Sequence, residues 1–118
     1  MKISKHFSRK EFACRCGCGQ DTVDAELISI LEEVRNHFKQ PVTITSGNRC
    51  KAYNAKVGGA KASLHITSRA ADFVVKGVSP KEVYDSLSRF VGNRFGIGLY
   101  GGWVHFDTRS GKKARWIK

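Results

Sequence analysis

Two short stretches of the chain carry histidine and aspartate at spacings that suit a metal ion. In SLHITSRAADF, His65 and Asp72 stand seven residues apart across a polar turn. In WVHFDTR, His105 and Asp107 stand two apart, so on a strand they point to the same face. Two histidines and one carboxylate are a typical catalytic zinc set, and zinc in such a site activates water and polarises a carbonyl. Four unconnected polar residues are the alternative interpretation, because a His/Asp pair on a strand is commonly a surface pair.

Four cysteines form a second group with metal-binding chemistry. Cys14, Cys16 and Cys18 alternate with other residues, and Cys50 lies far along the chain. Four thiolates could hold a structural zinc, although the C-x-C-x-C spacing is tighter than the usual pair separated by two residues. A disulfide from the N-terminal segment to Cys50 is the second interpretation, and it applies in an oxidising compartment. Reduced thiols are the third, and the sequence does not choose among them.

Helical and strand patterns place these residues on separate elements. Apolar spacing predicts a helix over 24–39 with Asp24 as its N-cap, and Ser79-Pro80-Lys81-Glu82 predicts the start of another. Shorter helical turns are expected from residue 8 and over 50–57. Strands are expected at 41–46 and 71–75, with a hairpin around Gly101-Gly102. The sum is an α+β fold with a small, largely antiparallel sheet and packed helices.

Length and composition indicate one globular domain over residues 1–118. The chain is 41% hydrophobic and 26% charged and has no low-complexity tract. Lys plus Arg number 21 against 10 for Asp plus Glu, a net charge of +11. This charge favours anionic partners such as nucleic acid, anionic lipid surfaces or bacterial cell wall, and a soluble basic surface without such a partner is an equal alternative. The basic residues are scattered, so a nucleic-acid partner is not expected. The N-terminus lacks an apolar signal core and no run spans a bilayer, so we expect synthesis in the cytoplasm, and a monomer.

The order of six motifs along the chain is that of a known enzyme family. They are SGNRC (46–50), Asn54, VGGA (57–60), SLHITSRAADF (63–73), GIGLY (96–100) and VHFDTR (104–109). In this order they resemble the zinc D-Ala-D-Ala peptidase family, which shares a fold with the hedgehog signalling domain. FSRKEFACRCGCG (7–19) is similar to the start of its short phage and prophage members, many of them peptidoglycan hydrolases. The resemblance covers nearly the whole chain and implies a hedgehog/DD-peptidase-like fold.

The resemblance also implies roles for single residues. The family's zinc ligands match His65, Asp72 and His105. Arg49 matches the arginine that contacts the substrate's carboxylate, which a guanidinium fork suits, and a structural ion pair is its alternative. Positions near the substrate match Ser63, Asn54 and Tyr100. For Asn54 and Tyr100, bracing a loop or filling the cleft wall is an equal alternative.

Two positions depart from the family's pattern. Many relatives have glycine three residues after the first ligand, where this chain has Ser68, and serine at a positive φ costs on the order of 1 kcal/mol. The vancomycin-resistance dipeptidases of this superfamily use a glutamate three residues before the last ligand, where this chain has Gly102. Asp107 is therefore the candidate for the general base, or else it orients His105 from behind.

The leading hypothesis is a peptidoglycan peptidase with one catalytic Zn²⁺. It would hydrolyse stem peptides as a D-Ala-D-Ala carboxypeptidase or endopeptidase, in the manner of a phage endolysin that reaches the cell wall after release from the host cytoplasm. The alternative is a catalytically inactive metal-binding recognition domain of the same fold, as in hedgehog proteins, and Gly102 favours it. A nucleic-acid binder, the third hypothesis, rests on charge alone.

Overall fold

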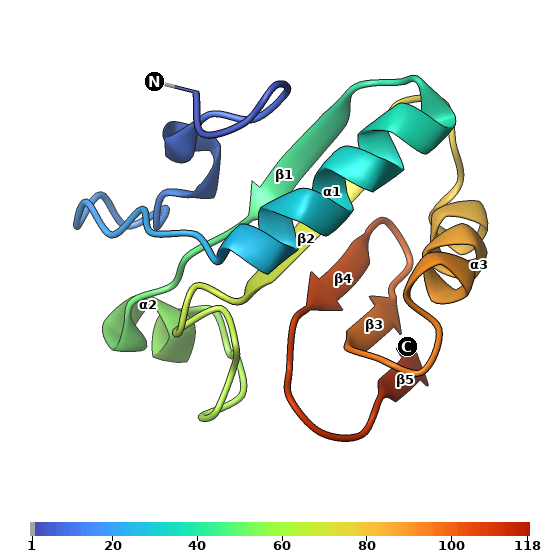
Figure 1. Ribbon diagram of the computed structural model, residues 1–118. Coiled ribbons are helices and arrows are strands. Elements are labelled where there is room, and N and C mark those ends of the chain that lie inside the picture. The colour runs from blue at the N-terminus through green and yellow to red at the C-terminus, as the bar shows by residue number, and fades with distance from the viewer. Residues whose placement is uncertain (1) are drawn as a thin grey trace.

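Five strands form one sheet in the computed structural model, which describes residues 2–118 (Figure 1). The strands lie in the spatial order β1 (Val42–Ser46), β2 (Ala70–Val75), β4 (Val104–Asp107), β3 (Gly96–Leu99) and β5 (Ala114–Ile117). Neighbouring strands are antiparallel except β3 and β5, which run parallel. The predicted α+β class with a largely antiparallel sheet is confirmed, whereas β5 was not predicted.

Two helices cover one face of the sheet. In α1 (Ala25–Phe38) the Asp24 side chain accepts a hydrogen bond from the amide of Leu27, and in α3 (Pro80–Val91) Ser79 caps in the same way. Figure 1 shows α1 lying across β1 and β2, with α3 beside β3. Both predicted caps are confirmed. Among the described residues, no helix has the length and apolar character needed to cross a membrane.

The N-terminal segment is attached to the core and to α1. It contains one 3-10 turn, η1 (Arg9–Phe12), and it buries Phe7 and Phe12. Glu32 on α1 accepts hydrogen bonds from the Ser4 hydroxyl and from the backbone amide and ring of His6. These contacts hold the chain in place just before the segment that carries Cys14, Cys16 and Cys18.

The two faces of the sheet have opposite character. Residues facing the helices are apolar and buried, namely Ala71, Phe73, Ile97, Val104 and Phe106. On the other face, one row of paired residues crosses all five strands and consists of Ser46, Asp72, His105, Gly98 and Trp116. Strand β4 includes His105 and Asp107 as expected, and the alternating residues Val104 and Phe106 are buried in the core. Helices α1 and α3 lie on the opposite face, so within residues 2–118 this row is left open to form a site.

Candidate active site

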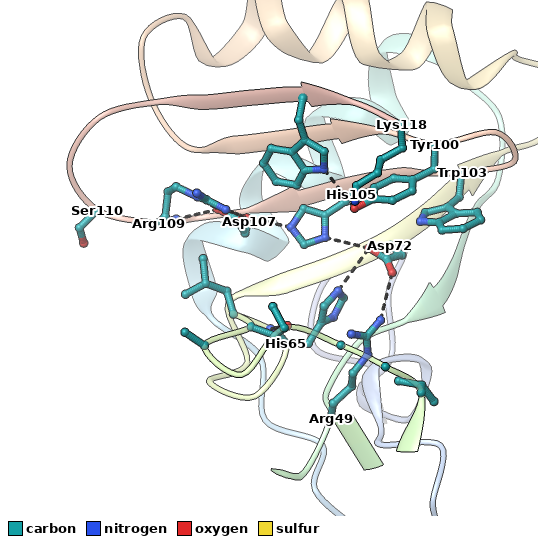
Figure 2. Close-up of a pocket in the computed structure, with 18 residues that line it drawn as sticks. Arg49, His65, Asp72, Tyr100, Trp103, His105, Asp107, Arg109, Ser110 and Lys118 are labelled. Atoms are coloured by element: carbon teal, nitrogen blue, oxygen red, sulfur yellow. Dashed lines mark hydrogen bonds and ion pairs between the residues drawn. The ribbon is translucent and has the colours of Figure 1, made fainter. Parts of the chain in front are cut away.

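Three side chains converge on one point of the uncovered face. Oδ1 of Asp72 lies 3.2 Å from Nε2 of His65 and 2.9 Å from Nδ1 of His105. The three ligand atoms lie within 4.8 Å of one another (Figure 2). Asp72 and His105 are directly paired across β2 and β4, while His65 comes from the loop before β2. Two imidazoles and a carboxylate at this spacing fit a divalent zinc ion.

Both histidines are oriented by partners behind them. Nδ1 of His65 lies 2.7 Å from the carbonyl oxygen of Gly47, and Nε2 of His105 lies 2.7 Å from Oδ2 of Asp107. A carbonyl or carboxylate oxygen only accepts, so these ring nitrogens carry the protons and donate. The opposite nitrogens, Nε2 of His65 and Nδ1 of His105, face Oδ1 of Asp72 and are the ones that a metal ion would take in place of their protons. Metal-binding histidines are commonly held in this way.

Both carboxylates of the site are held ionised. Burial raises the pKa of the Asp72 carboxyl, but hydrogen bonds from His105 and His65 outweigh it and hold that pKa well below its usual range. Burial likewise raises the pKa of Asp107, and hydrogen bonds from Arg109 and His105 bring it well below the usual range. Asp72 is therefore ready to bind a cation without first losing a proton.

The turn between the first two ligands is left-handed at Ser68. Its φ is 65°, so the positive φ considered for this position is present. The Ser68 hydroxyl donates to Oδ1 of Asn48 at 2.6 Å and lies 2.6 Å from the Thr22 hydroxyl, and its carbonyl accepts from the amide of Asp24. These hydrogen bonds offset the backbone strain, and the turn closes with His65 and Asp72 together.

Arg49 reaches the same point from the loop after β1. Its guanidinium lies 3.4 Å from Oδ2 of Asp72, and it also donates to the Ser46 hydroxyl and to Oδ1 of Asn54. The ion pair considered as an alternative role for Arg49 thus exists. Asn54 is only 3% exposed and does not line the cleft; its amide also holds the carbonyl of Ala60. Asn54 therefore holds Arg49 and the Ala60 carbonyl, which corresponds to the bracing role that the sequence left open beside a substrate contact.

A cleft of about 850 Å³ opens over the three ligands. Its walls include the predicted Ser63 and Tyr100. Tyr100 stacks on Trp103 with ring centroids 4.8 Å apart, and its hydroxyl accepts a hydrogen bond from Nε1 of Trp116 at 3.0 Å. Since that bond uses a lone pair, the Tyr100 hydroxyl proton remains available to a substrate oxygen.

The cleft residues that were missed from the sequence include Arg109, Trp116 and Lys118. Arg109 ends the VHFDTR motif two residues after Asp107, and this spacing was the sequence signal that could have identified it. In the structure the two side chains form an ion pair. Trp116 reaches the cleft because β5 lies beside β3, where a Cβ on Gly98 would come within 2.3 Å of Nε1 of Trp116. Glycine at this position of GIGLY leaves room for the indole.

Comparison with known proteins decides the family. A family model described as Peptidase M15 matches residues 5–107, which include all three candidate ligands and Arg49. The chain belongs to the Peptidase M15 family. This is the zinc D-Ala-D-Ala peptidase family that the motif order indicated, and it makes the protein a metallopeptidase by membership. A search of curated proteins found no match to the chain.

The acid that some relatives of this M15 peptidase place before the last ligand has no counterpart here. Gly102 is exposed in the turn between β3 and β4. Among the cleft-lining residues that the structure describes, the only carboxylates are Asp72 and Asp107. The Asp107 side chain is fully buried and accepts from His105 and three times from Arg109. These contacts favour orientation of His105 over proton transfer as the role of Asp107.

The four cysteines of the M15 chain come together outside the cleft. All are free thiols, and Cys14, Cys16, Cys18 and Cys50 place their sulfur atoms within 4.8 Å of one another. The sequence proximity of the first three was readable, whereas their meeting with Cys50 depends on the fold. The structure thus contains a second cluster of metal-binding groups.

Proposed function

We propose that this M15 metallopeptidase hydrolyses peptide bonds in the stem peptides of bacterial peptidoglycan. The observation that carries the proposal is the position of Arg49, a cation that lines the same cleft as the three ligands and lies beside Asp72. A guanidinium there suits a substrate carboxylate, and stem peptides carry carboxylates on side chains and at their ends. The motif order supports the same substrate class.

The ligands His65, Asp72 and His105 would hold the zinc, which supplies a Lewis acid that polarises the scissile carbonyl and lowers the pKa of water. The residues around them orient the substrate. Arg49 binds the carboxylate of the peptide and so fixes its register. This anchoring positions the scissile bond at the three ligands. The Tyr100 hydroxyl accepts from Nε1 of Trp116, and its O–H donates a hydrogen bond to a substrate oxygen. Ser63 also lines the cleft and in this proposal contacts the peptide backbone.

We further propose an endolysin-type role. The net charge of +11 concentrates the protein on anionic wall material. In this role the chain acts as a single domain and as a monomer, on the cell wall, after release from the host cytoplasm. The reaction is of the D-Ala-D-Ala carboxypeptidase or endopeptidase type.

The test is digestion of purified sacculi in zinc-containing buffer. The expected result is a fall in turbidity with new amine ends, and mass spectrometry of the released muropeptides then identifies the bond that is cut. A His105→Ala variant, which lacks one ligand, is the negative control. If the wild-type protein loads zinc and yet releases no amine from sacculi or isolated muropeptides, the hydrolase proposal is wrong.

A catalytically inactive recognition domain is the second candidate. The observation in its favour is the engagement of Asp107 with Arg109, together with Gly102 at the position of the missing acid. This candidate predicts zinc-dependent binding of wall fragments without cleavage. Binding by calorimetry, run beside the amine assay on the same muropeptides, separates the two functions.

A further inference from the structure

Outside the cleft, the cysteine cluster has the geometry of a tetrahedral metal site. Sγ of Cys16 lies 3.4 Å from Sγ of Cys14 and 3.6 Å from Sγ of Cys50, and all four sulfur atoms lie within 4.8 Å of one another. Four sulfurs about 2.3 Å from a zinc ion stand about 3.8 Å apart, whereas a disulfide needs about 2.05 Å. The two separations from Cys16 are close to the edge of a ZnS₄ tetrahedron, and the 4.8 Å bound on the other sulfur pairs accommodates it.

Backbone amide donors and basic side chains surround the cluster. The backbone amide of Cys50 donates to Sγ of Cys14, and the amide of Tyr53 donates to Sγ of Cys50, both at 3.4 Å. The side chains of Arg15 and Lys56 line the small cavity beside Cys16 and Cys50. A zinc ion with four thiolates carries a net charge of −2, which amide donors and two cations stabilise.

The cluster joins the N-terminal segment to the loop that serves the active site. The amide of Asn48 donates to the carbonyl of Phe12 at 2.8 Å, and a Cβ on Gly47 would come within 2.7 Å of the Phe12 backbone. Gly47 orients His65, and the neighbouring Arg49 lies beside Asp72. Cys50 follows directly, so a metal held there would fix this loop from its far end.

We propose that Cys14, Cys16, Cys18 and Cys50 bind a structural zinc ion that clamps the N-terminal segment onto the loop of residues 46–50. Binding replaces the thiol protons, which pass to the buffer, and leaves four sulfur–zinc bonds with no change of oxidation state. The site is distinct from the three-ligand centre and does not depend on the substrate proposed above.

Metal content and thiol reactivity of the full-length protein test the proposal. We expect two zinc ions per chain in the wild type, one in His65→Ala, and one in the double variant C16S/C18S, whose two cysteines are exposed. Cobalt-substituted wild type and His65→Ala should both show a sulfur-to-cobalt charge-transfer band that C16S/C18S lacks. In the zinc-loaded protein all four thiols should resist alkylation until a chelator removes the metal.

The readouts separate the competing states of the cysteines. One zinc per chain with four rapidly alkylated thiols overturns the proposal in favour of reduced thiols. Two thiols that react only after a reductant is added overturn it in favour of a disulfide. Because His65→Ala keeps every cysteine, its remaining zinc decides the matter even if C16S/C18S fails to fold. The clamp itself predicts at least tenfold faster hydrogen exchange at the amides of Asn48 and Arg49 once this zinc is lost, and unchanged exchange refutes it.

Discussion

Replacing Asp107 with asparagine distinguishes an orienting residue from a general base. The Asp107 carboxylate accepts from Nε2 of His105 at 2.7 Å and from the Arg109 side chain at 2.8 and 2.9 Å. Asparagine keeps one acceptor oxygen and adds an NH₂ group. It therefore cannot satisfy both partners, and an amide donor facing His105 favours the tautomer with its proton on Nδ1. That proton blocks the nitrogen that faces Asp72.

The expected loss in zinc affinity is 10- to 100-fold, the usual effect of removing a partner that orients a metal-binding histidine. This corresponds to about 1.4 to 2.8 kcal/mol of binding free energy. With zinc in excess, the occupied variant should regain most of its turnover. A general base behaves differently, since its loss lowers kcat by about 10² to 10⁴ even at full occupancy. The orienting role therefore predicts a lower zinc affinity with kcat largely retained. The general-base role predicts an unchanged zinc affinity with a much lower kcat.

The assay is competition with a chromophoric chelator, followed by muropeptide hydrolysis at saturating zinc. Asp85→Asn is the matched control, because Asp85 is a partly exposed carboxylate on α3 that pairs with Lys81. Its zinc affinity and turnover should equal those of the wild type. Wild-type zinc affinity in Asp107→Asn together with a kcat lowered 100-fold or more would refute the orienting role.

Substitutions at three positions, Ser68, Gly98 and Glu32, test the fold. Ser68→Ala should destabilise the protein by about 1 kcal/mol more than Ser68→Gly in urea unfolding, because both lose the hydroxyl and only glycine relaxes at φ 65°. Gly98→Ala should cost about 1 to 3 kcal/mol by displacing Trp116, whereas Gly101→Ala, with open space around it, should not. Burial raises the pKa of the Glu32 carboxyl, but hydrogen bonds from Ser4 and His6 lower it overall. The ionised carboxylate therefore stabilises the folded protein above about pH 4.5, and this stabilisation is lost as the pH falls through the pKa of the folded state. Glu32→Gln should therefore destabilise by about 1 to 3 kcal/mol at neutral pH and progressively less in acid unfolding series; an equal loss at every pH contradicts the reasoning.

Local patterns predicted most of the secondary structure, and β5 shows where they stop. The caps of α1 and α3, the strands β1 and β2 and the hairpin of β3 and β4 depend on neighbouring residues, so their signals lie within short windows. The strand Ala114–Ile117 is half exposed and pairs in parallel with β3. Its apolar pattern is weak because it covers no core, and its pairing is set by distant residues.

For the site, the ligand residues were predictable from the sequence, but the ring nitrogen with which each histidine faces the metal position was not. The three candidate ligands were chosen from the sequence, and the structure brings them together. That His65 faces the metal position with Nε2 and His105 with Nδ1 depends on Gly47 and Asp107. Asn54 was expected equally as a brace or a contact, and its burial behind Arg49 comes from its place on the short helix α2 (Lys51–Lys56) and its hydrogen bond to the Ala60 carbonyl.

The loop of residues 46–50 links both clusters, and this explains why SGNRC occurs as an unbroken run. Each residue has a different partner. The Ser46 hydroxyl holds Arg49, and the Gly47 carbonyl orients His65. Asn48 ties the loop to the N-terminal segment and to the left-handed turn at Ser68, and Cys50 belongs to the sulfur cluster. No position can shift along the chain without losing its partner. The sequence assigned this motif one role, that of an arginine that binds a carboxylate. In the structure the same five residues connect the cysteine cluster to the peptidase centre, so a metal bound by the cysteines would act on that centre through them.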